Sequence, residues 1–228
     1  MSQRPSASAN DSLLTVRDAI TRTADYLSAK GISTARLDAE LLIGEAVGLN
    51  RLGLYLNFDR PLNPAERERA RELLRRRARY EPVAYILGRR EFRSREFAVD
   101  RRVLIPRPET ELLVDHAIEE LGRRFPDAGG AWSILEFGIG SGAIAVSLAA
   151  ELPGARITAT EISEGAADVA RANAMRHGVS DRIDIRLQPD FAGLDGPFHA
   201  IVSNPPYISP ADRDSLPPDV RDYEPAEA

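Results

Sequence analysis

The stretch Ile134–Ala145 constrains the fold most, because it joins an apolar run to a helical pattern through three closely spaced glycines. Gly138, Gly140 and Gly142 let the backbone turn sharply and approach a ligand closely. A helix is expected over residues 143–150, directly after this turn. The spacing is G-x-G-x-G, which differs from the G-x-G-x-x-G of dinucleotide sites. A strand, a glycine turn and a helix in this order predict an α/β fold built on a parallel sheet.

Two further strands are predicted downstream, and each ends beside an acidic residue. Residues 156–160 end in Glu161, where a carboxylate can accept both hydroxyl protons of a ribose. The next apolar run, which ends at residue 187, leads to Asp190 and Phe191, a carboxylate and a ring that could hold the edge and face of an adenine. Glu136 ends the first strand in the same way. Solvated strand-end charges and a core phenylalanine are the alternative interpretations.

A fourth apolar run, residues 199–203, leads into Asn204-Pro205-Pro206-Tyr207. The two prolines fix φ at about −65° and lack backbone N–H donors. The carbonyl oxygens of the prolines therefore stay free to accept hydrogen bonds. The asparagine side chain adds another carbonyl, and the tyrosine adds a flat ring. Together these groups predict an acceptor pocket for a planar –NH2 group. A proline-rich turn that simply ends a strand is the alternative.

Taken together, the motifs resemble class I S-adenosylmethionine-dependent methyltransferases, whose Rossmann-like sheet binds ligands at the carboxyl ends of its strands. In such enzymes the Asn-Pro-Pro-Tyr motif marks methylation of a planar nitrogen, either a side-chain amide or an exocyclic base amine. The resemblance implies S-adenosyl-L-methionine as the cofactor. The residues that it assigns to cofactor binding are Glu136, Gly138, Ile139, Gly140, Ser141, Gly142, Glu161, Asp190, Phe191 and Asn204.

Three upstream stretches narrow the resemblance: Glu81–Gly88, Glu91–Phe92 and Leu104–Val114. They are similar to the release factor glutamine methyltransferase family, which methylates the glutamine side-chain nitrogen of the Gly-Gly-Gln motif in class 1 peptide chain release factors. The discriminating part is Arg-Pro-Glu-Thr, residues 107–110. The resemblance implies catalytic roles for Asn204, Pro205 and Tyr207. It also implies that the substrate is bound by Asn204, Pro205, Pro206, Tyr207, Arg107 and Glu109.

The chain departs from the pattern of this family in three places. Asp190-Phe191 stands where the family usually has Asp-Trp, and Arg93-Ser94 stands where it usually has Trp-Gly. The chain ends at Ala228, whereas family members continue and supply the last strands of the sheet. We therefore expect a sheet that is incomplete at its C-terminal edge, with the strand before Asn204 at that edge and with a tendency to lose stability or self-associate.

The domain organisation follows from these patterns. We expect a disordered tail over 1–12, a small helical bundle over 13–88, a linker β-hairpin over 89–108 and a truncated catalytic domain over 109–228. Thr15, Thr34, Asn63 and Thr110 are the predicted helix N-caps. The predicted inner face of the second helix carries Leu37, Leu41 and Val47.

Composition limits the chemistry. The chain has 228 residues and no cysteine, which excludes disulfides, thiolate metal sites and cysteine nucleophiles. Its three histidines are far apart in sequence, so no metal site is predicted. No apolar stretch is long enough to span a membrane, and residues 1–10 lack the apolar core of a signal peptide. A cytoplasmic enzyme is the expectation.

The charge is unevenly distributed. Residues 1–110 hold 21 basic and 15 acidic side chains, and residues 111–228 hold 9 and 20. The arginine run over 75–79 is read either as a solvated helix face or as a surface for a partner or RNA. Because the catalytic half is acidic, no stable nucleic-acid binding is expected. Two alternatives stay open, namely a nucleic-acid adenine N6-methyltransferase and an inactive remnant that binds cofactor.

Overall fold

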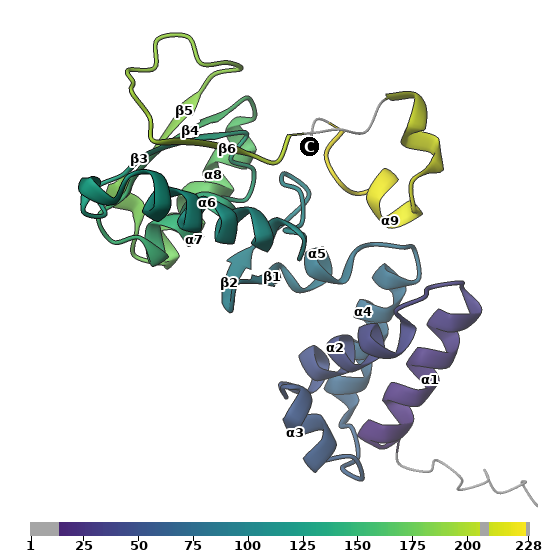
Figure 1. Ribbon diagram of the computed structural model, residues 1–228. Helices are drawn as coiled ribbons and strands as arrows, with labels where there is room; N and C mark the ends of the chain where they lie inside the picture. Colours follow the sequence, from purple (N-terminus) through teal and green to yellow (C-terminus); the bar gives the residue numbers. More distant parts are fainter. Residues whose placement is uncertain (1–13, 206–209, 227–228) are drawn as a thin grey trace, which may run out of the picture. The chain divides into compact units, whose positions relative to one another are not determined.

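The computed structural model describes residues 14–205 and 210–226, which belong to two compact units, Met1–Leu87 and Gly88–Ala228 (Figure 1). The tail predicted over 1–12 lies outside the described residues, as do Pro206 and Tyr207. Each unit has its own buried apolar clusters and is described separately.

The N-terminal unit is helical. Its helices are α1 (Val16–Ala29), α2 (Ala35–Val47), α3 (Arg51–Leu56), α4 (Pro64–Arg77) and α5 (Val83–Leu87). Two predicted N-caps are confirmed as capping boxes. Thr15 Oγ1 accepts from the Asp18 N–H at 3.2 Å, and Asn63 Oδ1 accepts from the Glu66 N–H at 2.9 Å. In each box the acidic side chain accepts from the backbone N–H of the cap, so that two otherwise unpaired donors are satisfied.

The second helix buries a different face from the one predicted. Leu37 and Leu41 are 45% and 40% exposed, whereas Leu42 and Ile43 are buried. The physical reason is Asp38, which points inward and accepts from the guanidinium of a distant arginine on α4. Because a polar side chain occupies an inner position, the buried face of α2 is rotated relative to the face that the spacing of its apolar residues indicates. Thr34 stands at the predicted N-cap position of α2, but its side chain makes no capping hydrogen bond and instead donates to Asp38 at 2.9 Å.

The arginine run is not simply a solvated face. Arg77 is buried and its Nε donates to the Asp38 carboxylate at 2.7 Å. Arg76 donates through two nitrogens to Glu81, each at 2.8 Å. Two arginines of the run therefore hold the bundle together from inside or at its margin.

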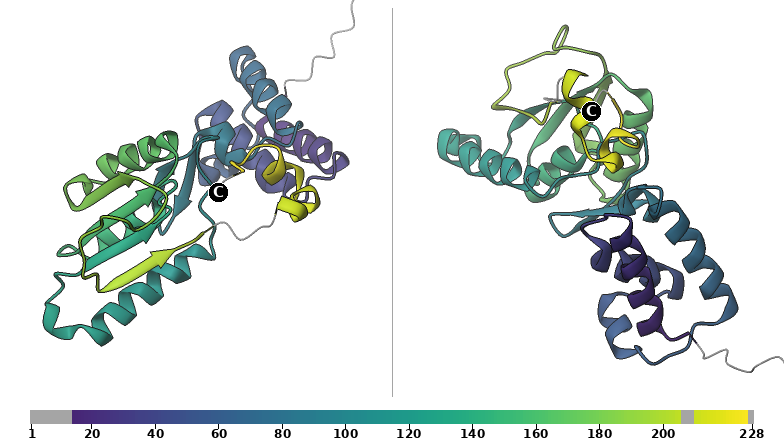
Figure 2. Two further views of the ribbon diagram at one scale, coloured as in Figure 1. Left: turned by 90° about the horizontal axis from the view of Figure 1, so that it is seen from above. Right: turned by 90° about the vertical axis from the view of Figure 1, so that its right-hand side faces the viewer.

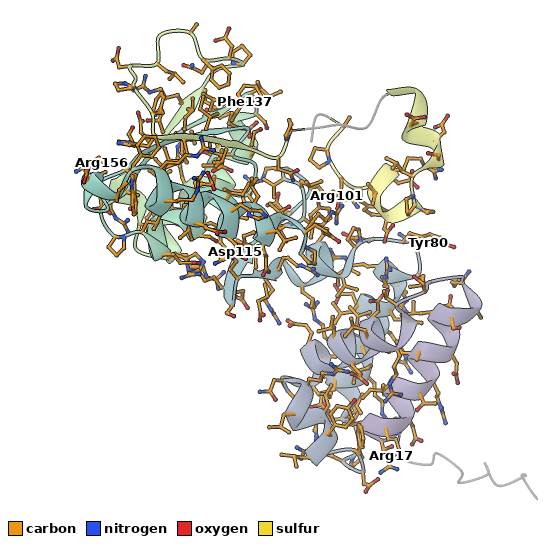
Figure 3. All side chains as sticks on the ribbon, viewed as in Figure 1. Arg17, Tyr80, Arg101, Asp115, Phe137 and Arg156 are labelled. Atoms are coloured by element: carbon orange, nitrogen blue, oxygen red, sulfur yellow. The ribbon has the colours of Figure 1, made fainter. Side chains whose placement is uncertain are left out.

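A two-stranded antiparallel hairpin opens the second unit, with β1 (Arg89–Phe92) and β2 (Arg95–Ala98). Its turn residues Arg93 and Ser94 have φ of +50° and +56°. Arg93 anchors this turn, because its guanidinium donates to Glu151 at 2.6 Å and to Asp115, which is labelled in Figure 3, at 2.7 Å. The residue that departs from the family pattern thus fixes the hairpin to the helices behind it.

The sheet is parallel, with the order β5-β4-β3-β6. Its strands are β3 (Ser133–Phe137), β4 (Arg156–Glu161), β5 (Ile183–Leu187) and β6 (Ala200–Ser203). All four strands were predicted. Among the described residues β6 pairs with β3 alone, so it is an edge strand as expected, and its Ile201 is 63% exposed.

Three helices cover one face of this sheet (Figure 2). They are α6 (Thr110–Arg124), α7 (Ala143–Glu151) and α8 (Glu164–Arg176). Contacts between α6 and α7, and between α7 and α8, place them in one layer. The register aligns Ile134, Ile157 and Ile183 in a row, and the first two are fully buried in the main apolar cluster.

The remaining elements are short. They are the 3-10 turns Pro126–Ala128, Ser180–Arg182 and Pro210–Ser215, and the helix α9 (Pro218–Arg221). Thr110 is the first residue of α6, not its cap, and Glu109 at the cap position makes no side-chain capping bond. None of the helices in the described residues is long and apolar enough to cross a bilayer.

Candidate active site

A cavity of about 390 Å³ opens at the carboxyl ends of β3, β4 and β6. This size lies within the range of small-molecule sites, and the position is where open parallel sheets bind ligands. Predicted site residues in its wall are Glu136, Gly138, Ile139, Ser141, Glu161, Asn204, Pro205 and Arg107. The cavity therefore brings the glycine turn, the second-strand acid and the Asn-Pro pair together.

The glycine turn is held by hydrogen bonds from outside itself. The N–H groups of Gly138 and Ile139 both donate to the Thr160 carbonyl, each at 3.0 Å. The Ser141 carbonyl accepts from the side-chain amide of Asn173 at 2.8 Å. Because these partners lie on β4 and α8, the turn is fixed before any ligand arrives.

Glu161 is the third anchor of the turn. Its Oε2 accepts from the Gly140 N–H at 2.9 Å, and its Oε1 accepts from the N–H groups of Ile162 and Ser163 at 2.9 and 3.0 Å. The carboxylate is thus oriented by three backbone donors while it lines the cavity. Each carboxylate oxygen has further lone pairs, so the predicted contact with ribose hydroxyls is compatible with this arrangement.

Glu136 is 1% exposed and lies at the cavity wall, one residue before the end of β3. Burial raises the pKa of its carboxyl well above the ordinary value, the charge of Glu161 raises it further, and the Ala145 N–H opposes the shift. Among the described residues its Oε2 has no hydrogen-bond partner. A buried polar atom left open at a cavity wall fits a site that receives a polar ligand group.

The expected adenine end differs in detail from the prediction. Gln188 and Pro189 line the cavity, whereas Asp190 and Phe191 do not. Asp190 accepts from the Ala192 N–H, and the Phe191 ring lies 5.1 Å from the ring of Phe137, which does line the cavity (Figure 3). Gly140 and Gly142 also lie outside the lining; Gly140 instead donates to Glu161.

At the opposite end, Asn204 and Pro205 share the wall with Arg107, while Glu109 is exposed and not part of it. Pro206 and Tyr207 lie outside the described residues. Sequence reasoning missed several lining residues: Arg102, Leu104, Pro106, Thr110, Ile162, Gln188 and Pro225. Ile162 carried a usable signal in the sequence, because it directly follows the second-strand acid.

Comparison with known proteins identifies the family. Residues 18–88 match the profile of the PrmC N-terminal domain, and residues 110–216 match that of the methyltransferase small domain. The release factor glutamine methyltransferase of Chlorobaculum tepidum is 49% identical over 89% of this chain and 71% of its own length. The chain belongs to the release factor glutamine methyltransferase family. That of Geobacter sulfurreducens is 47% identical over 94% of this chain and 72% of its own length.

Membership of this family confirms the predicted fold class, a class I S-adenosylmethionine methyltransferase, and the predicted cofactor. The cavity suits that cofactor, because it combines a fixed glycine turn, two acidic side chains and apolar walls. The solved structure of a human methyltransferase 10 domain containing protein is 21% identical with a TM-score of 0.42, covering 49% of this chain and 54% of that one.

Proposed function

We propose that this family member transfers the methyl group of S-adenosyl-L-methionine to the glutamine side-chain nitrogen in the Gly-Gly-Gln motif of class 1 peptide chain release factors. One observation supports this most directly. The two acceptors of the Asn-Pro pair, at 204 and 205, line the same cavity as the glycine turn. A planar amide and a methyl donor can therefore be held in one enclosure. The expected location is the cytoplasm, where release factors act.

The chain's own residues supply alignment. A carboxamide nitrogen is a weak nucleophile because its lone pair is delocalised into the carbonyl group. Asn204 Oδ1 and the Pro205 carbonyl would each accept one N–H of the glutamine amide, which holds the nitrogen in place and favours a pyramidal geometry. Tyr207 would pack on the amide plane. As the nitrogen gains the methyl group it releases one proton, for which water is a sufficient acceptor.

The cofactor residues have distinct proposed roles. When bound, S-adenosylmethionine supplies an electrophilic methyl group on a cationic sulfur. The turn from Gly138 to Gly142 would cradle its methionine and ribose portion, with Glu161 on the ribose hydroxyls. Glu136 would contribute its buried, unpaired oxygen at the same wall. Phe191 would act on the adenine indirectly, because its ring packs against Phe137, which lines the cavity.

A protein substrate is favoured over nucleic acid by charge. Residues 111–228 hold 20 acidic against 9 basic side chains, whereas binding to phosphate backbones needs basic surface around the site. Arg75, Arg76 and Arg77 pair with acidic side chains, which gives no support to an RNA surface there. We therefore propose release factors as the partner and no stable complex with nucleic acid.

Mass spectrometry of a Gly-Gly-Gln-containing release factor, after incubation with this protein and labelled cofactor, tests the proposal. One added methyl group on the glutamine is the expected result. Asn204→Leu removes the acceptor at similar volume and should lower turnover on the order of a hundredfold. Asn204→Asp keeps an oxygen acceptor and should retain more activity. Binding of S-adenosylhomocysteine without any methylated glutamine would exclude this substrate or show an inactive, cofactor-binding protein.

A further inference from the structure

The segment that contains α9 returns to the loop between the hairpin and α6. The Arg107 guanidinium donates to Glu224 Oε2 at 2.6 Å across 117 positions of sequence. The Arg101 guanidinium lies 4.5 Å from the centre of the Tyr223 ring. The Glu224 N–H donates to the Val220 carbonyl, so the carboxylate projects from a closed backbone turn. Two neighbouring side chains thus tie residues 218–226 to residues 101–107.

This attachment lies at the substrate end of the cavity. Arg107 and Pro225 both line the cavity that also contains Asn204 and Pro205. Pro225 directly follows Glu224, so whatever fixes the carboxylate also fixes this part of the wall. Leu104, Pro106 and Pro225 give this end an apolar surface whose two prolines have no N–H. Such a surface suits a Gly-Gly backbone, which presents no side chains before its glutamine.

The Arg107–Glu224 ion pair fixes the relative position of the two segments more than it stabilises the fold. The Glu224 side chain is 3% exposed and that of Arg107 is 36% exposed. Burial raises the pKa of Glu224 although Arg107 acts to lower it, so desolvation outweighs the pairing. Ion pairs of this kind add little net stability, but they define one geometry. The guanidinium is neutralised by its partner and is directed at the chain itself.

We propose that Arg107 and Glu224 form a clasp that fixes residues 218–226 as the outer wall of the substrate end, and that both are positioning residues for the substrate glutamine. Arg107 then acts through Glu224 and not by gripping the release factor directly, which replaces the substrate-binding role expected from the sequence. This inference rests on the proposed function.

A double-mutant cycle tests it, with Arg107→Met, Glu224→Gln and the double variant. Each single variant should raise the KM for the release factor by about tenfold to a hundredfold, while affinity for S-adenosylhomocysteine stays within about twofold. The double variant should resemble the worse single variant, because both remove one interaction. An unchanged KM in Glu224→Gln, or additive effects in the cycle, would show that Arg107 contacts the substrate itself and would overturn the proposal.

Asp184→Asn is the control, since it removes a surface carboxylate that pairs with Arg186 on β5, outside residues 218–226 and outside the cavity wall. It should leave the KM within about twofold. Amide hydrogen exchange supplies a readout without turnover: the N–H groups of Arg221, Asp222 and Glu224 should exchange faster in Glu224→Gln than in the wild type. Unchanged exchange refutes the clasp whatever the substrate is. Failure of the wild type to methylate a release factor, with faster exchange in the variant, refutes only the proposed function.

Discussion

Replacing Asn173 by alanine should damage both the stability of the second unit and its affinity for cofactor. This side chain on α8 is fully buried. Its Oδ1 accepts from the Ala98 N–H at 2.8 Å, and its Nδ2 donates to the carbonyls of Ala98 at 3.0 Å and Ser141 at 2.8 Å. One amide therefore joins the hairpin to the glycine turn. The alanine variant leaves three backbone groups in a buried region without their partner.

The size of the effect follows from these three bonds. Each is worth about 1 kcal/mol net, and an unpaired buried group costs about 1–3 kcal/mol, so the total loss is roughly 3–5 kcal/mol after partial relaxation. For a unit of this size each kcal/mol lowers the melting temperature by about 2–4 °C, which gives a decrease of roughly 6–20 °C. Asn57→Ala is a suitable control, because Asn57 donates a single hydrogen bond, to Gly53, in the other unit. It should cost about 1 kcal/mol.

Calorimetric unfolding measures the first effect, and titration with S-adenosylhomocysteine measures the second. Because Ser141 lines the cavity and loses its anchor, the dissociation constant of the variant should rise by about tenfold or more, measured well below its melting temperature. A variant that melts at nearly the wild-type temperature would refute the hydrogen-bond reasoning. Lower stability with unchanged affinity would show that the turn keeps its shape without Asn173.

Three further predictions concern buried groups. Because the pKa of Glu136 is raised in the folded protein, the free energy of unfolding should increase as pH falls from that pKa toward 4.5 and decrease as pH rises over the same range. The slope should reach at most about 1.4 kcal/mol per pH unit. Thermal melts at several pH values should show that Glu136→Gln abolishes this slope. Gly142→Ala should destabilise more than Gly178→Ala in denaturant titrations, since both have positive φ but only the former places a methyl group 3.3 Å from α8. Arg77→Met should cost about 3–5 kcal/mol in the unfolding of the N-terminal unit, because it leaves the buried Asp38 carboxylate without its cationic partner; a loss below about 1 kcal/mol would show that the pair is dispensable.

Local patterns made much of the catalytic unit predictable. The four strands could be placed because short apolar runs there end at glycine, acidic or proline signals, as at Glu161 and Asn204. The convergence of those ends follows from parallel strands alone. The N-caps at Thr15 and Asn63 were also predictable, since each is a capping residue directly before a helical pattern, and the structure shows a capping box at both.

Partners far apart in sequence account for most of what was missed. The inner face of α2 depends on a pairing across 39 residues between Asp38 and Arg77, which no local period reveals. The engagement of Arg107 by Glu224 spans 117 residues, so the Arg-Pro-Glu-Thr stretch suggested a role toward the substrate alone. Gln188 replaced the expected residues in the cavity wall because a loop, unlike a strand, has no period from which side-chain direction can be read.

The hairpin is anchored twice within the second unit, and this couples it to the methyl-donor site. Arg93 fixes the tip of the hairpin to α6 and α7, and Asn173 fixes its second strand to α8. The hairpin therefore moves as a rigid body with the catalytic unit. Because Asn173 also holds the Ser141 carbonyl, a load on the hairpin is passed directly to the glycine turn that lines the cavity.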